Sequence, residues 1–249
     1  EGRTYQYPIT IEKEHNYHHG VLKSEAFIVS KASETAEEVM VECRYYANAG
    51  NDAVFRDFPH EFKCKITYRL TAEGLEQEVV FFNRSETRMP LGVGFHTPLS
   101  IPFAGGDAAD YVMRVAVGEQ VELNERNLPT GRKLPLSEQF AKLREGGLRV
   151  TECDPIEAGF TLKEIDVNGK SFRGALVENV RTGARIFYEV DSQTTYWTIW
   201  NNGGRVPYCC PEPQSWTTNA PNLPNPSAEG FRTIAPGESW RMVFRLYAK

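Results

Sequence analysis

The chain has 249 residues, of which 41% are hydrophobic and 24% charged, and its formal net charge is −5. This length and composition are typical of a globular protein with a substantial core, and no segment reads as a membrane span or a signal peptide. The acidic balance and the absence of Lys- or Arg-rich runs argue against nucleic acid and anionic membranes as partners.

A period of two residues dominates the chain, and this period is typical of β-strands. The segments with this pattern, rich in Val, Ile, Tyr, Phe and Trp, are residues 64–70, 75–83, 111–117, 184–190, 196–200 and 240–247. Turn-forming clusters bound them, at residues 72–74, 83–90, 181–183, 201–204 and 235–239. In the first segment Ile66, Tyr68 and Leu70 share one face and alternate with polar residues, which predicts a half-buried antiparallel strand.

Helical signals are weak in this chain. Residues 135–146 predict a short helical turn or a loop, anchored by Phe140 and Leu143. No linker, low-complexity tract or internal repeat divides the sequence. We therefore predict one all-β domain over residues 1–249, a sandwich or a barrel of many antiparallel strands.

Five cysteines are present, and an odd number cannot pair completely: Cys43, Cys64, Cys153, Cys209 and Cys210. Their spacing lacks the CxxC and paired Cys/His patterns of metal sites. A disulfide framework is unusual in a chain of this length. We expect free thiols in a reducing cytoplasm, several of them buried as small apolar residues.

The first candidate functional segment is NYHHG at residues 16–20. Gly20 permits a sharp turn into the next strand. Adjacent histidines on a strand point to opposite faces, so His18 and His19 cannot both ligate one ion, and at most one faces a pocket. The alternative is that neither has a function.

The second candidate segment is NRSETRMPLGVGFHTPLSIPF at residues 83–103. A proline and two glycines interrupt a strand just before His96, and Phe95 and Pro98 flank it. A histidine held in this way is partly desolvated and titrates near neutrality, so it can transfer a proton. The alternative is a core histidine bonded to a main-chain carbonyl.

The third candidate segment is YCCPEPQSWTTNAPN at residues 208–222. Glu212 stands between two prolines after an apolar, aromatic run, and we expect the strand to end there and a turn to begin. Surrounding apolar side chains can raise the pKa of a carboxyl group toward the value that a general base needs at neutral pH. The alternative is a solvated turn residue.

Motifs of other enzyme classes are missing from the sequence, namely GxSxG, HExxH and a glycine-rich phosphate loop. What remains is a glutamate and two histidines in an all-β chain with many aromatic residues. Aromatic rings suit the apolar faces of a sugar, and polar turns supply hydrogen bonds to its hydroxyls. The set indicates acid–base chemistry without a metal or an organic cofactor.

Taken in this order, the three segments resemble the aldose 1-epimerase (galactose mutarotase) family. The HHG motif resembles the family's first active-site histidine segment, which implies His19 as a sugar ligand. The second segment is similar to the family's "N…MP…G.H.YF" pattern, which implies His96 as the general acid. The third implies Glu212 as the general base, with Gln214 beside it as a further sugar ligand. The resemblance spans the chain from Gly2 onward.

The sequence also departs from the family's pattern. Of an upstream "GR..NRI"-like segment only Gly2-Arg3 is present, so Arg3 is expected as a sugar ligand, and the family's first strands are expected before residue 1. Pro98-Leu99 replaces the usual "YF", so the sugar-facing wall differs. A sugar-binding aspartate is expected between His96 and Glu212, and Asp166 and Asp191 are the candidates.

The resemblance implies a β-supersandwich and an enzyme that interconverts the α and β anomers of a free aldose. Its only expected partner is a small sugar, with no nucleic acid and no membrane, and the protein is expected to be a monomer or a homodimer in the cytoplasm.

Three alternatives stay open. One is a non-catalytic carbohydrate-binding module on the same fold. Another is a hexose-6-phosphate 1-epimerase, which needs convergent cationic side chains for the phosphate; the available ones are Arg3, Arg56, Arg84 and Arg88. The third is a polysaccharide lyase or a hydrolase, and the hydrolase needs a second carboxylate paired with Glu212.

Overall fold

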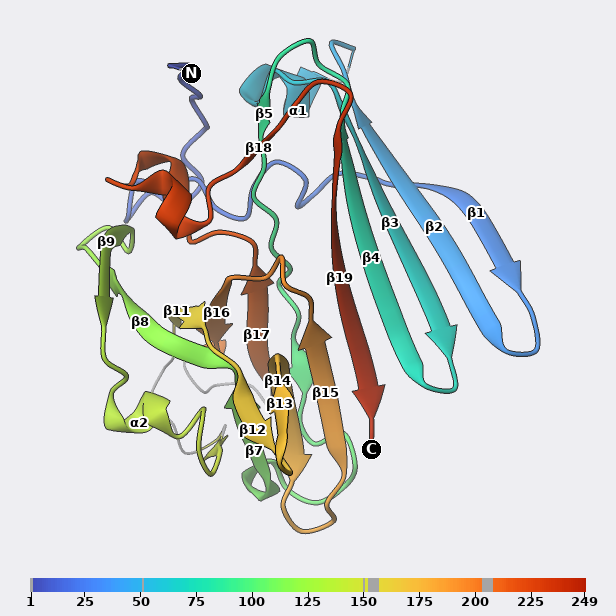
Figure 1. The fold of residues 1–249 in the computed structure, drawn as a ribbon, viewed down its shortest axis with the longest axis vertical. Helices are drawn as coiled ribbons and strands as arrows, with labels where there is room; N and C mark the ends of the chain where they lie inside the picture. The colour runs from blue at the N-terminus through green and yellow to red at the C-terminus, as the bar shows by residue number, and fades with distance from the viewer. Residues whose placement is uncertain (1, 51, 150, 152–156, 203–207) are drawn as a thin grey trace. The chain divides into compact units, whose positions relative to one another are not determined.

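The computed structural model describes residues 2–50, 52–149, 151, 157–202 and 208–249 (Figure 1). Their contacts group the chain into two units. Unit 1 comprises Glu1–Leu91, Leu123–Leu128 and Arg232–Val243, and unit 2 comprises Gly92–Glu122, Pro129–Phe231 and Phe244–Lys249. The single domain over residues 1–249 stays a prediction. Among the described residues, no helix has the length and apolar character needed to cross a membrane.

Unit 1 is built on an antiparallel sheet in which successive strands lie side by side in chain order (Figure 1). The tight turn between β3 and β4 pairs Thr71 with Gly74, whose positive φ of 128° suits glycine. The elements of this unit are β1 (Ile28–Glu34), β2 (Glu38–Ala47), α1 (Asp52–Asp57), β3 (Phe62–Thr71), β4 (Gly74–Asn83), β5 (Met89–Pro90), β18 (Thr233–Ile234) and the first half of β19 (Ser239–Ala248).

Burial along β3 differs from the sequence prediction. The apolar face predicted from Ile66, Tyr68 and Leu70 is covered only near the start of the strand, where Phe62 and Cys64 are buried. Toward the β3–β4 turn Leu70 is 52% exposed, whereas Thr67 on the other face is 2% exposed. The core ends before the hairpin does, so the predicted half-buried strand is confirmed, but its apolar face is covered only over the first part of the strand.

Unit 2 contains a six-stranded sheet in the order β6-β17-β16-β11-β8-β9. The end of β19 continues into a second group of strands in the order β15-β14-β7-β10. The strands of the six-stranded sheet are β6 (Leu99–Ser100), β8 (Val117–Leu123), β9 (Pro129–Leu134), β11 (Glu157–Leu162), β16 (Tyr196–Trp200) and β17 (Tyr208–Gln214). The other elements are β7 (Tyr111–Val115), α2 (Glu138–Ala141), β10 (Leu148–Arg149), β12 (Ile165–Val167), β13 (Lys170–Phe172), β14 (Gly174–Asn179) and β15 (Arg185–Val190).

Alternation along β16 and β17 gives the six-stranded sheet two different faces. On the core face Trp197, Ile199 and Cys209 have no exposed surface. Residues directly opposite each other in an antiparallel pair share a face, and Thr198 lies opposite Glu212. The polar side chains of β16 and β17 are therefore collected on the face turned away from that core.

Most sequence predictions of secondary structure are confirmed. The segments predicted as strands correspond to β3, β4, β7, β15, β16 and β19. The predicted helical turn is α2, where the Ser137 hydroxyl accepts a hydrogen bond from the Phe140 main-chain N–H. The two residues predicted to anchor it are also confirmed, because Leu143 is fully buried and the Phe140 ring packs edge-on against Phe160.

Four of the five cysteines lie among the described residues, and their location in a reducing cytoplasm stays a prediction. They are Cys43, Cys64, Cys209 and Cys210, and all but the first are buried, as predicted for several of them. Cys153 lies outside the described residues.

Candidate active site

Glu212 lies inside β17 and not in a turn. The strand continues through the Pro-Glu-Pro sequence to Gln214, and the Glu212 residue is 8% exposed. The expectation that the strand ends there is therefore wrong, as is the alternative of a solvated turn residue. The carboxylate is held on a rigid strand with little access to water.

Hydrogen bonding explains why two prolines fit this strand. In an antiparallel ladder the N–H and C=O of one residue point to the same side. The carbonyl oxygen of Pro213 accepts a bond from the Phe95 N–H at 3.2 Å, on the side away from β16. The ring nitrogen of Pro213 therefore also points away from β16. Pro211 stands two residues earlier on the strand, so its ring nitrogen points to the same side. Neither proline removes an N–H donor from the β16–β17 ladder.

The segment before His96 is fixed against the end of β17. The main chains of Val93 and Ser215 pair, with Ser215 N–H to Val93 C=O at 2.8 Å, and the Ser215 hydroxyl accepts from Val93 N–H at 2.9 Å. A side chain at Gly92 would collide with the Trp216 ring, since an added Cβ would lie 1.7 Å from it. The glycine thus allows the close approach that brings His96 to β17.

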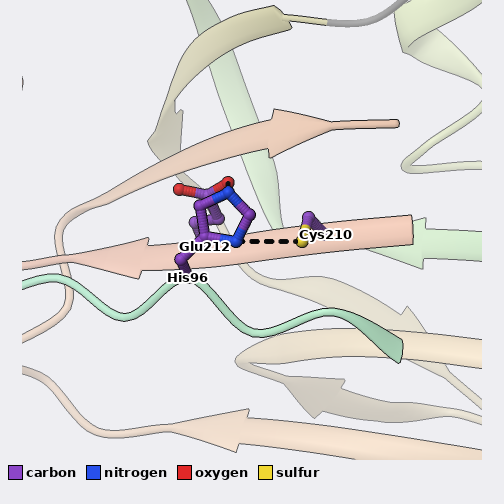
Figure 2. Close-up of side chains that lie close together, drawn as sticks. All are labelled: His96, Cys210 and Glu212. Atoms are coloured by element: carbon purple, nitrogen blue, oxygen red, sulfur yellow. Dashed lines mark hydrogen bonds and ion pairs between the residues drawn. The ribbon is translucent and has the colours of Figure 1, made fainter. Parts of the chain in front are cut away.

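The His96 ring contacts two side chains of β17 through its two nitrogens (Figure 2). Nε2 lies 3.3 Å from Oε1 of Glu212, and Nδ1 lies 3.3 Å from Sγ of Cys210. The ring also stands edge-on to Trp200, with centroids 5.3 Å apart. Because the side chain is 38% exposed, His96 is not a core histidine, and that alternative is wrong.

These groups belong to one face of the sheet, which we call the site face. Its members are Glu157 of β11, Thr198 and Trp200 of β16, and Cys210, Glu212 and Gln214 of β17. The Gln214 amide donates to the Thr198 hydroxyl at 2.9 Å, which fixes the residue predicted as a sugar ligand. The Trp200 ring contacts Tyr208, with centroids 5.7 Å apart, so aromatic surface borders the carboxylate.

The environment of Glu212 favours its protonated form. Burial, and secondarily the negative charge of Glu157, raise the pKa of Glu212 from its usual 4.5 to about 8. A proton on His96 acts in the opposite direction, because a positive charge 3.3 Å away stabilises the carboxylate. The contact thus places a carboxyl group with a raised pKa next to an imidazole, which are the two kinds of group that general acid–base catalysis uses.

The same three side chains offer donor atoms that a metal ion accepts. One ligand atom each of His96, Cys210 and Glu212 lies within 4.8 Å of the others, a set suited to Zn²⁺. However, one ion takes one nitrogen of an imidazole, and here each nitrogen faces a different partner. The geometry is that of a hydrogen-bonded group, and a metal would require the ring to turn.

The two aspartates predicted as sugar ligands close turns. An oxygen of the Asp166 carboxylate accepts from the Gly169 N–H at 3.0 Å, within the separate β12–β13 sheet. An oxygen of Asp191 accepts from the Gln193 N–H at 2.9 Å after β15. These bonds give both residues a structural role, and sugar binding by either stays a prediction.

Arg3 and His19 belong to unit 1, whereas His96 and Glu212 belong to unit 2. The charge of Arg3 acts on buried His60, whose pKa is lowered to about 4, mainly by burial and secondarily by this arginine. His19 is exposed and adopts a positive φ of 66°. The roles of Arg3 and His19 as sugar ligands stay predictions.

The prediction that His18 and His19 point to opposite faces is wrong. Their rings stack with centroids 3.7 Å apart. The rule of alternation applies to strands, and this segment is not a strand: His19 has a left-handed backbone conformation, as has Gly20 after it.

Sequence analysis missed the other two ionisable side chains of the site face. Cys210 was interpreted only as a buried apolar residue, and Glu157 was not considered. A signal for Cys210 was available, because it stands two residues before Glu212 and residues i and i+2 of a strand share a face. Glu157 could not be found in this way, since its place depends on the pairing of β11 with β16.

Comparisons with known proteins agree with this fold. Residues 1–247 match the model of the aldose 1-epimerase family. A galactose mutarotase-like protein from Clostridium acetobutylicum is 36% identical, with a TM-score of 0.95 over 100% of this chain and 73% of that protein. The predicted fold, a β-supersandwich of the galactose mutarotase-like type, is confirmed by this match.

More distant solved structures share the fold. A galactose 1-epimerase from Lactobacillus acidophilus NCFM is 15% identical, with a TM-score of 0.68 over 98% of this chain and 73% of that one. An aldose epimerase homologue from C. elegans is 13% identical, with a TM-score of 0.62 over 92% of this chain and 70% of that one.

Proposed function

Because the chain belongs to the aldose 1-epimerase family, we propose that it interconverts the α and β anomers of a free aldohexose. The observation that carries the proposal is the contact of 3.3 Å between Nε2 of His96 and Oε1 of buried Glu212. The two oxygens that must exchange protons in anomerisation are bonded to one sugar carbon. An acid and a base placed next to each other can reach both of them.

The proton transfers of this mechanism balance within the pair. The Glu212 carboxylate takes the proton of the C1 hydroxyl, a carbonyl forms at C1, and the C1–O5 bond breaks. Its electron pair goes to O5, which takes the proton of the His96 imidazolium. The open-chain aldehyde rotates about C1–C2, O5 attacks the other face of the carbonyl, and both protons return.

Other groups of the site face would bind the sugar. The Trp200 and Tyr208 rings offer apolar surface for the face of a pyranose, and Gln214 offers amide hydrogen bonds. His19 and Arg3 are further proposed ligands by their resemblance to the family's segments. The mechanism needs no metal or organic cofactor, and the free thiols of the described cysteines are consistent with work in the cytoplasm.

A phosphorylated hexose is the second candidate substrate. Of the four arginines available for a phosphate, Arg56 is paired with Asp57 at 2.7 Å. Arg88 donates to the Thr233 hydroxyl at 2.9 Å. Their present contacts would have to open to bind a phosphate, so these two arginines do not favour the 6-phosphate.

Polarimetry tests the proposal directly. Freshly dissolved α-glucose and α-galactose should lose optical rotation faster with the protein than without it, and glucose 6-phosphate should respond less. Acceleration limited to glucose 6-phosphate would favour the phosphorylated substrate. Sugar binding detected by NMR without faster exchange of anomers would instead indicate a non-catalytic binding module.

A further inference from the structure

Cys210 is the second partner of His96, and the acid–base mechanism above does not use it. Its Sγ lies 3.3 Å from Nδ1, while Nε2 faces Glu212 (Figure 2). We infer that Cys210 is a positioning residue, whose thiol fixes the orientation and the tautomer of the His96 imidazole. This inference rests on the proposed function, because it assigns Nε2 as the atom that donates the proton to the sugar.

The two partners differ in how firmly they are held. Cys210 is in a central strand and has no exposed surface, whereas His96 lies between the Gly94 bridge and β6, outside any strand. The imidazole is 38% exposed, so packing alone does not surround it. A bond from one nitrogen to a buried strand residue removes the freedom of the ring to turn over.

The proton transfer of the mechanism decides which tautomer the contact has to hold. Burial, and secondarily the charge of Glu212, raise the pKa of Cys210 to about 12, so the sulfur stays a neutral thiol. When Nε2 of the imidazolium gives its proton to O5, the neutral ring keeps its hydrogen on Nδ1. Nδ1–H can donate to the thiol sulfur before and after this transfer, so one contact serves both states of the acid.

A thiol also suits this position electrostatically. A carboxylate beside Nδ1 would place a second negative charge near Glu212 and raise its pKa further. It would also stabilise the imidazolium and so weaken it as an acid. A neutral partner orients the ring without either effect.

The chain offers a matched control for testing Cys210. Cys209 is the same residue type, is equally buried, and points to the core face because it is adjacent on the strand. Substitution of either cysteine by alanine removes the same atoms from a buried site. A difference between the two variants therefore reports the contact with His96 and not the loss of packing.

The experiment compares Cys210→Ala, Cys210→Ser and Cys209→Ala by polarimetry and by ¹⁵N NMR of the histidine rings, with thermal unfolding as a check of folding. In Cys210→Ala we expect kcat to fall about tenfold with little change in KM, as expected for the loss of one hydrogen bond. Cys210→Ser should recover part of that loss, because a hydroxyl oxygen can also accept a hydrogen bond from Nδ1–H. Cys209→Ala should lose stability while kcat and the ring tautomer stay unchanged.

The NMR measurement keeps this inference separate from the proposed function. The ¹⁵N shifts should show neutral His96 with its hydrogen on Nδ1 in the unchanged protein and a mixture of tautomers in Cys210→Ala, whether or not the protein accelerates anomerisation. A folded Cys210→Ala variant with unchanged tautomer and kcat would overturn the positioning role. Equal losses of kcat in Cys209→Ala and Cys210→Ala would overturn it as well, because packing would explain both.

Discussion

The two faces of the six-stranded sheet differ although neighbouring residues of the same strands build them. On the core face Ile199 is fully buried among apolar side chains. On the site face the next residue along the strand, Thr198, lies opposite Glu212, and the Glu212 carboxyl group has a raised pKa. In β16 and β17 the odd-numbered residues therefore contribute to stability and the even-numbered residues to the candidate active site. Substitutions at adjacent positions should accordingly change either the free energy of unfolding or kcat.

The largest expected effect is on the site face. Glu212→Gln keeps the shape of the side chain and removes the base, so kcat in polarimetry should fall by at least about a hundredfold, the lower end of what positioned acid–base groups contribute. Sugar binding measured by calorimetry should survive. Glu119→Gln, the same change at an exposed position of β8, is the control and should keep the rate. An unchanged rate in folded Glu212→Gln would remove this residue from the mechanism.

A core-face substitution should give the reverse pattern. Ile199→Ala deletes fully buried atoms, so the free energy of unfolding measured with urea should fall by about 2–5 kcal/mol. The folded fraction should keep most of its kcat, because Ile199 points away from Glu212. A large loss of kcat at unchanged stability would show that the two faces are not separate in function.

The raised pKa of Glu212 also predicts how this carboxyl group affects stability. Below pH 4.5 it is protonated in both the folded and the unfolded chain, so its ionisation does not affect the free energy of unfolding. As the pH rises toward 8, the unfolded chain loses this proton and the folded protein keeps it, so the folded state is progressively destabilised. Each unit of pKa difference corresponds to about 1.4 kcal/mol.

Glutamine does not titrate, so Glu212→Gln should gain in melting temperature over the unchanged protein between pH 4.5 and pH 8. The gain should then level off. Melting curves followed by circular dichroism from pH 4 to pH 9 measure this difference. A difference that stays constant across this range would mean that the pKa of Glu212 is not raised in the folded state.

The sequence predicted the fold correctly, and two of the residues that it singled out lie next to each other in the structure. Strands such as β16 can be predicted from the sequence because the alternation of apolar and polar residues is a local property of the chain. His96 and Glu212 were found from their segments, and the structure brings them within 3.3 Å. The Pro-Glu-Pro sequence was misinterpreted as a turn, because whether a proline fits a strand depends on which side of the ladder its nitrogen faces.

The remaining features depend on contacts between distant segments. The buried face of β3 is set by where the core of unit 1 ends, so the exposure of Leu70 could not be read from alternation. The contact of Cys210 with His96 joins residues 114 positions apart in the sequence. Glu157 acts on Glu212 from another strand, and strand order follows from the whole topology.

The smallest expected effect concerns Glu157, which lies on the same face of the sheet as Glu212. Its negative charge is the lesser cause of the raised pKa of Glu212, after burial. Glu157→Gln should therefore lower the pKa of Glu212, and the acid limb of the kcat/KM profile should move to lower pH. At pH values above 8 the two proteins should react at similar rates, because Glu212 is then ionised in both.

Glu157 is exposed at the start of β11, so raising the salt concentration should screen its charge and reduce the shift. A hydrolase that used Glu157 as its second carboxylate would instead lose activity at every pH, which makes the full profile the decisive measurement.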